Sequence, residues 1–256
     1  NSISYDVSSD KKVVYNTGCA FGNFQKLLED YPIESLEDTI PDFHNTKKRY
    51  EKFEEDLQLD VCNRAATAKD EIEYLKSCSD CASIIVDLMD EGKIPYRVTH
   101  NDTKVNNVMM DKSTGEYLTV IDLDTVMKGS LLYDYADAIR SAAASAFEDE
   151  EDLSKVFLRT ALFESFTDGF LEEVASTLTK DEVENMAKSV EIITYELALR
   201  FLNDYINGDT YFKTKYDKHN LVRARNQLKL LIDIKDKSKY MDAYIKETYK
   251  QKIKNK

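Results

Sequence analysis

Residues 97–124 read RVTHNDTKVNNVMMDKSTGEYLTVIDLD, and the interpretation of the whole chain depends on this stretch. His100, Asp102 and Asn107 follow the spacing H-x-D-x-x-x-x-N, which is typical of a phosphoryl-transfer loop. In such a loop the Asp accepts the proton of the attacking hydroxyl, and the Asn holds a metal ion. One tight loop can place a carboxylate beside the nucleophilic oxygen and hard oxygen ligands near the Mg²⁺ that neutralises the phosphates.

A β-hairpin is predicted directly after this loop. Residues 108–121 run from an apolar segment through a turn-rich segment to a β-branched one. Such a hairpin returns the chain to the loop, so that Asp122 and Asp124 can lie beside Asn107. Asp122 then takes the position of the metal-binding Asp of the D-F-G tripeptide, which this chain lacks. Each short motif alone could be a surface polar cluster, but their order and the hairpin between them favour a phosphoryl-transfer site.

Several segments carry a resemblance to a known family. They read THNDTKVNNV at 99–108, VIDLDTVM at 120–127, GSLLYD at 129–134, IPDFHNT at 40–46, RFLNDY at 200–205 and GDTYFK at 208–213. The chain resembles the aminoglycoside phosphotransferase and choline kinase superfamily over residues 15–231, and within it most resembles the bacterial N-acetylhexosamine 1-kinases. The resemblance implies a protein-kinase-like α+β fold, present here mainly as its α-helical C-terminal lobe with a small β-hairpin.

The same resemblance implies an activity and an acceptor site. The activity is ATP- and Mg²⁺-dependent phosphorylation of the anomeric hydroxyl of N-acetylglucosamine or N-acetylgalactosamine. Residues matching Arg200 and Tyr211 contact the sugar in that family, and His44 could contact a sugar hydroxyl. The residues alone also allow a surface Arg200, a core Tyr211, and a His44 that only precedes a helix capped by Asn45 or Thr46.

The resemblance also assigns roles around the loop. Asp102 orients and deprotonates the acceptor hydroxyl, and Lys104 helps to neutralise the transferred phosphoryl group. Asn107 and Asp122 hold Mg²⁺, while Asp124 supports the metal site directly or through water. His100 and Asp134 have supporting roles, and Asp134 is expected to brace the loop through hydrogen bonds to its backbone.

Glycine and strand patterns lead to an expectation about domain organisation. A complete kinase of this class begins with a small β-rich lobe that carries a lysine and a loop over the phosphates. The chain has 7 Gly, none spaced as G-x-G, and no leading series of strands. We therefore expect residues 1–256 to be the C-terminal lobe without the nucleotide lobe, and to have weak or undetectable kinase activity alone.

Composition limits the partners. The 256 residues suffice for one domain, with 42% hydrophobic and 32% charged residues. A net charge of -13 argues against nucleic acid as a partner. No apolar run approaches the ~20 residues of a membrane span, so we expect no membrane partner and a cytoplasmic location. The expected partners are ATP and a small-molecule sugar, and the oligomeric state stays open.

The four cysteines are Cys19, Cys62, Cys78 and Cys81. Cys78 and Cys81 form a C-x-x-C pair, but a structural zinc site needs four ligands and no second such pair or paired-His motif exists. We therefore expect reduced thiols on or near the buried face of a helix.

Apolar spacing predicts a mainly helical chain. Gly18 and Gly22 indicate a helix over 13–28 that packs closely on a neighbour. Steps of three and four residues predict one long helix over 66–89 as the central pillar, which Gly92 ends. Other helices are expected over 46–59, 131–146, 153–178, 181–206 and 219–234.

Several polar features accompany these helices. The acidic run 148–152 reads as a solvated helix start, and Thr179 with Glu182 fits a capping box. Arg140 could pair with Asp137 or be solvated. The Lys-rich end up to residue 256 is expected to be a solvated helix or tail.

Two rival functions follow from the same sequence. One is another small-molecule kinase of the superfamily that acts on choline, homoserine or an aminoglycoside; the segment with Arg200 and Tyr211 favours a sugar. The other is a non-catalytic domain that only binds sugar or a partner. The complete set of Asp102, Asn107 and Asp122 favours an enzyme.

Overall fold

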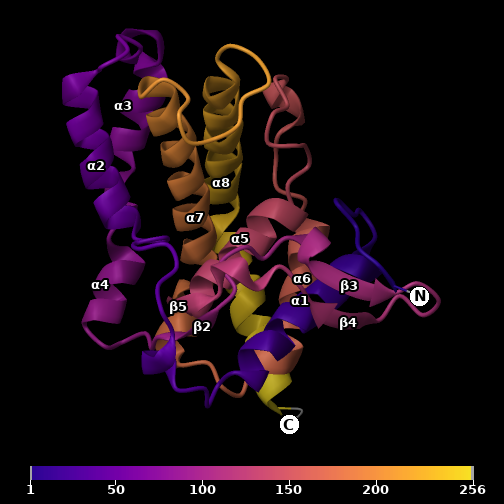
Figure 1. Ribbon diagram of the computed structural model, residues 1–256. Helices are drawn as coiled ribbons and strands as arrows, with labels where there is room; N and C mark the ends of the chain where they lie inside the picture. Colours follow the sequence, from indigo (N-terminus) through magenta and orange to yellow (C-terminus); the bar gives the residue numbers. More distant parts are fainter. Residues whose placement is uncertain (1, 255–256) are drawn as a thin grey trace.

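The computed structural model describes residues 2–254 and is predominantly helical (Figure 1). The helices are α1 Lys11–Leu27, α2 Thr46–Leu59, α3 Lys69–Ser77, α4 Ile84–Asp90, α5 Leu131–Ala142, α6 Thr160–Val174, α7 Lys180–Ile206 and α8 His219–Lys254. The strands are β1 Ser2–Ile3, β2 Arg97–Thr99, β3 Val108–Asp111, β4 Tyr117–Val120 and β5 Met127–Gly129. The predicted α+β class, mainly helical with a small hairpin, is therefore confirmed.

Two small sheets hold the segment between residues 97 and 129. The predicted hairpin forms, since β3 and β4 pair antiparallel with Val108 opposite Val120. The N-terminal strand β1, which the polar sequence of residues 1–10 did not predict, pairs antiparallel with β3. The second sheet pairs β2 with β5 and brings Thr99 opposite Met127. The loop after β2 is thus fixed on both sides.

The core centres on α5 and α7 rather than on the predicted helix over 66–89, which was wrong. That segment breaks into α3 and α4 with a 3₁₀ turn between them. The hydroxyl groups of Ser77 and Ser79 donate to the carbonyls of Tyr74 and Lys76, three residues earlier, and so compete with the helical hydrogen bonds. The break lets α3 pack against α7, while Ile85 and Met89 of α4 are buried in the core cluster that also contains the residues of α5.

Two predictions at helix ends need correction. The acidic run 148–152 starts no α-helix: Asp152 caps only a 3₁₀ turn, Leu153–Lys155, in a loop closed by the bridge between Ala144 and Leu158, and α6 begins at Thr160. The Lys-rich end is helical, which is one of the two predicted alternatives, because α8 continues to Lys254, but it is not wholly solvated. Met241 and Ile245 are buried on its inner face, which explains why the helix continues.

Close packing of α1 on α6 agrees with the small residues of α1. A Cβ on Gly18 would lie 2.3 Å from the carbonyl oxygen of Phe166, and one on Gly169 would lie 2.1 Å from that of Tyr15. The two backbones therefore touch, and they carry the hairpin beside them (Figure 1).

Other local predictions hold. The capping box of Thr179 and Glu182 is present at the start of α7, and Asn45 caps α2. Cys78 and Cys81 are unpaired, half-buried thiols at the break between α3 and α4. No helix within residues 2–254 is long and apolar enough to cross a membrane.

Candidate active site

Asp134 at the start of α5 holds the loop that follows β2. Its carboxylate accepts hydrogen bonds from the backbone N–H groups of His100 and Asn101, both at 2.8 Å, and from Gln25 of α1 at 2.7 Å. The hydroxyl of Thr103 donates to the Asp134 carbonyl at 2.6 Å. Burial raises the pKa of Asp134, and the hydrogen bonds from the His100 and Asn101 N–H groups and from Gln25 oppose this shift. The hydrogen bonds by which Asp134 was expected to brace the loop are therefore present.

The ring of His100 links the loop to the end of the hairpin. Its Nδ1 accepts from the N–H of Asp102 at 3.2 Å, so Nε2 carries the proton and donates to the carbonyl of Ile121 at 2.9 Å. Phe21 and Phe24 of α1 pack edge-on against the ring. His100 is thereby fixed in position and tautomer, and it fixes the chain directly before Asp122.

The carboxylate of Asp102 lies between a cation and an amide. Lys104 Nζ is 2.6 Å from Asp102 Oδ1, and Asn107 Nδ2 donates to the carbonyl and carboxylate oxygens of Asp102 at 2.8 and 3.1 Å. Burial opposes the charge of Lys104, but the hydrogen bond and charge of Asp102 outweigh it and raise the Lys104 pKa. The Asp102 side chain is 27% exposed, so a substrate can reach it.

The oxygen ligands expected for a metal lie at the base of the hairpin. Ile121 N–H donates to the Asn107 carbonyl at 2.9 Å, which brings Asp122 to the end of the loop, where its backbone is left-handed and its side chain exposed. Because the amide nitrogen of Asn107 donates to Asp102, the amide oxygen Oδ1 is free to coordinate a metal ion. Asp124 lies in the next turn, and its carbonyl accepts from Thr39 at 3.3 Å.

This donor set fits Mg²⁺. An amide oxygen and a carboxylate are hard ligands, and Mg²⁺ is commonly held by one or two protein groups together with water and substrate phosphates. Within residues 2–254, no group of three or more His, Cys, Asp or Glu side chains is arranged as a metal site of its own. A Mg²⁺ ion at Asn107 and Asp122 would therefore depend on the nucleotide for its other ligands.

A buried ion pair lies behind the loop. Arg140 donates to Asp137 at 2.9 Å and to Glu148 at 2.7 Å, so Arg140 is paired rather than solvated. Burial works against the charge of Asp137, but the charges of Arg140, Lys104 and His44 outweigh it and lower the Asp137 pKa. Asp137 therefore lies within electrostatic range of both the loop and His44.

His44 and Arg200 meet at Glu196, a residue that the sequence analysis missed. Glu196 Oε1 is 3.0 Å from His44 Nδ1, 3.6 Å from Arg49 and 4.0 Å from Arg200, and Oε2 accepts from Thr46 at 2.6 Å. Burial acts against the carboxylate, yet the neighbouring charges lower the Glu196 pKa to about 2. A carboxylate within the apolar face of α7 is the signal that could have indicated it.

Arg200 lies among aromatic rings. Its guanidinium is 5.4 Å from the ring centre of Phe43, 5.5 Å from Phe212 and 5.9 Å from Tyr211. Tyr211 is 66% exposed and is therefore not a core residue. Asp204, also missed from sequence, accepts the backbone N–H groups of Tyr211 and Phe212 and holds this segment in place.

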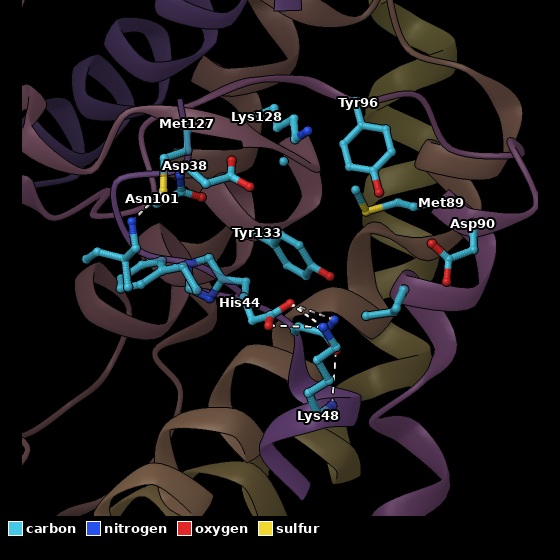
Figure 2. Close-up of a pocket in the computed structure, with 16 residues that line it drawn as sticks. Asp38, His44, Lys48, Met89, Asp90, Tyr96, Asn101, Met127, Lys128 and Tyr133 are labelled. Atoms are coloured by element: carbon cyan, nitrogen blue, oxygen red, sulfur yellow. Dashed lines mark hydrogen bonds and ion pairs between the residues drawn. The ribbon is translucent and has the colours of Figure 1, made fainter. Parts of the chain in front are cut away.

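Two neighbouring cavities contain these groups. Figure 2 shows the first, of about 340 Å³, which His44, Tyr133 and Asn101 line. The Nε2 of His44 is buried without a partner. Arg200 and Tyr211 line the second cavity, of about 480 Å³. Within residues 2–254 no hydrogen bond or ion pair joins His44, Arg200 or Tyr211 directly to Asp102, Lys104 or Asn107. Asn101, which belongs to the same loop, lines the cavity that contains His44.

A comparison with protein families identifies the chain. The profile described as "Phosphotransferase enzyme family" matches residues 5–166. The chain belongs to the phosphotransferase enzyme family. The match covers the loop, the hairpin and α5, where the expected phosphoryl-transfer residues lie.

Solved structures agree with this assignment at the level of the fold. A choline kinase from Cryptosporidium parvum Iowa II is similar with a TM-score of 0.55 and 12% identity, over 88% of this chain and 68% of that one. An ethanolamine kinase from Plasmodium vivax has a TM-score of 0.53 and 13% identity, over 88% of this chain and 62% of that one. The protein-kinase-like fold is thereby confirmed, and the chain spans about two thirds of the length of these kinases.

Proposed function

We propose that the protein takes part in ATP-dependent phosphoryl transfer to a hydroxyl group of a small molecule, and that Asp102 accepts the proton of that hydroxyl. The observation that carries the proposal is the setting of Asp102. Its reachable carboxylate lies between Lys104 and Asn107, on a loop that Asp134 and His100 fix, in a chain of the phosphotransferase family. Such pre-organisation is the main source of catalysis in phosphoryl transfer.

The remaining loop residues then have distinct tasks. Lys104 donates to the transferred phosphoryl group, and Asn107 Oδ1 and Asp122 hold Mg²⁺, with Asp124 as an outer support. When bound, Mg²⁺ supplies the positive charge that offsets the charge of the phosphates. In this proposal residues 1–256 act as the catalytic and acceptor-binding lobe.

For the acceptor we propose the anomeric hydroxyl of an N-acetylhexosamine, N-acetylglucosamine or N-acetylgalactosamine. His44 supports this choice, because its Nδ1 faces the Glu196 carboxylate and its buried Nε2, which has no partner within residues 2–254, can form a hydrogen bond with a sugar hydroxyl. The exposed ring of Tyr211 offers a flat face to a sugar, and Arg200 offers donors to an acetamido carbonyl.

A cationic acceptor such as choline, ethanolamine or an aminoglycoside is the second candidate, since the similar structures are a choline kinase and an ethanolamine kinase. A quaternary ammonium group is usually held against free aromatic faces. Around this cavity the guanidinium of Arg200 already occupies the neighbourhood of Phe43, Tyr211 and Phe212. A second cation would meet like charge, which favours a neutral acceptor.

Binding and turnover test the two parts of this proposal separately. Calorimetric titration of N-acetylglucosamine, and then of choline, should show sugar binding that Arg200→Ala removes and that Arg225→Ala, a change on the outer side of α8, leaves intact. Choline binding without sugar binding would refute the sugar. For the chemistry, Asp102→Ala should lower Mg-ATP-dependent turnover about 10²- to 10⁴-fold in any form of the protein that shows such turnover. Unchanged turnover would refute the role of Asp102.

A further inference from the structure

A third cavity, of about 500 Å³, is lined by Lys104 but not by Asp102 and contains none of the proposed sugar-binding residues. Its walls come from residues 6–9, the loop of residues 104–106, the end of α5, the loop before α6, Lys215 and the first turns of α8. Figure 1 shows the segment after α5 and the connection between α7 and α8 at the same end of the molecule. The cations that line the cavity are Lys104, Arg140, Arg159, Lys215 and Arg223, and the acids are Asp6, Glu148 and Asp149.

Most of the lining charges are already paired. Arg140 binds Glu148, and Lys215 Nζ is 3.0 Å from Asp149. Lys104 is paired with Asp102. These pairs consume two of the three acids and leave an excess of positive charge in the cavity, although the whole chain carries a net charge of -13.

Arg159 and Arg223 form no ion pair with any other residue in the range 2–254. Arg159 donates to the Ser9 hydroxyl at 2.8 Å and the Ala142 carbonyl at 3.1 Å, which leaves its charge without a carboxylate. The guanidinium of Arg223 lies 4.9 Å from the ring centre of Phe201. In both arginines the Nε atom is buried and has no acceptor. Two half-buried arginines at one cavity therefore each have a buried Nε–H donor without an acceptor within residues 2–254.

Two buried acceptors complement these donors. Gln227 is only 1% exposed, and its Oε1 has no hydrogen-bond partner among residues 2–254. Asn106 Oδ1, two residues after Lys104, is also buried without a partner in that range. A buried polar atom without a hydrogen bond costs on the order of 1–3 kcal/mol, so a molecule that supplies the missing partners is favoured.

We propose that this cavity binds a small molecule through a carboxylate or phosphate group, which Arg159 and Arg223 hold, while Gln227 and Asn106 accept hydrogen bonds from its hydroxyl or N–H groups. A guanidinium fork matches either anion in shape and charge. The volume lies in the range of small-molecule sites. Because an N-acetylhexosamine is neutral, this anionic ligand differs in chemistry from the proposed acceptor. The proposed anion site therefore does not depend on the identity of the acceptor.

Arginine side-chain NMR tests the site directly. Inorganic phosphate, and separately glycolate, should shift the Nε–H resonances of Arg159 and Arg223 saturably at constant ionic strength. Arg223→Gln should weaken binding by at least about tenfold, because a charge-assisted hydrogen bond is lost. Arg225→Gln is the matched control, since Arg225 lies two residues further on α8 and pairs with Glu71 outside the cavity.

The outcomes separate the possible sources of the anion. Saturation by phosphate alone would identify a phosphate ester as the ligand, and saturation by glycolate alone would identify a hydroxy acid. Saturation by both would show that the cavity binds either anion. Shifts that sodium chloride reproduces, or equal weakening by Arg225→Gln, would overturn the proposal. The measurement needs neither ATP nor turnover, so its failure leaves the proposed phosphoryl transfer untouched.

Discussion

Replacing Asp134 with Ala should destabilise the protein strongly and at one defined place. The change removes the acceptor of three hydrogen bonds of 2.7–2.8 Å. Two of the donors are buried backbone N–H groups, those of His100 and Asn101, and each costs about 1–3 kcal/mol when left unpaired. The gross loss is therefore about 2–6 kcal/mol.

A compensating term reduces this loss. Burial raises the pKa of Asp134, which means that the carboxylate is desolvated and that its removal relieves part of that cost. The carboxylate nonetheless accepts several N–H donors, which is the arrangement that offsets desolvation. We therefore expect a net loss of at least about 2 kcal/mol in the free energy of unfolding, a large share of the 5–15 kcal/mol typical of a folded domain.

Urea unfolding at pH 7 measures the loss, and amide hydrogen exchange locates it. The exchange of the His100 and Asn101 amides should accelerate more than that of amides elsewhere in the core. Asp236→Ala is the control, because Asp236 is exposed on α8. A loss below about 1 kcal/mol, or no local change at these two amides, would refute the reasoning that Asp134 braces the loop.

Three further changes test other parts of the structure. The Glu196 pKa of about 2 lies below its usual 4.5. The ionised carboxylate therefore stabilises the folded protein fully above pH 4.5, and this contribution is lost as the pH falls toward 2. The contribution to the free energy of unfolding is on the order of 3 kcal/mol. Between pH 7 and 3 the free energy of unfolding measured in urea should therefore fall more steeply for the natural protein than for Glu196→Gln. Gly18→Ala should cost about 1–3 kcal/mol despite the better helix propensity of Ala, because α1 must move away from Phe166; an unchanged melting temperature would contradict this contact. Met241→Ala should cost about 2–5 kcal/mol in urea unfolding, whereas a residue in a solvated tail would cost nothing.

The loop was predictable from sequence because its partners are close along the chain or fixed by a hairpin. His100, Asp102 and Asn107 lie within eight residues, and the apolar, turn-rich and β-branched segments of residues 108–121 predict the hairpin that returns Asp122 to them. Asp134 was predicted through the family resemblance. Its hydrogen bonds to the loop reach back only about thirty residues, through the pairing of β2 with β5, whereas the one from Gln25 spans 109 residues and was not predicted.

The failures have two other causes. The period of apolar residues over 66–89 does not show that the hydroxyl groups of Ser77 and Ser79 bond to carbonyls three residues earlier and divide the helix, which is a local effect. After residue 234 the sequence predicted a solvated helix or tail, and the helix forms; charge did not show that Met241 and Ile245, at helical spacing, are buried in the core.

The same distinction separates the chemistry of this protein from its choice of ligand. The loop is built from local contacts, whereas His44 meets Glu196 across 152 residues of sequence and Arg64 meets Asp209 across 145. The residues around the two proposed acceptor cavities come from the segment before α2, from α2, α4, α5 and α7, from the segment before α8 and, through Asn101, from the loop itself. Glu196 and Asp204 hold His44, Tyr211 and Phe212 in place without contacting Asp102. A substitution there can alter what is bound while the phosphoryl-transfer geometry stays intact. Sequence similarity over the loop therefore predicts the reaction class, and the acceptor must be inferred from distant side chains that only the folded chain brings together.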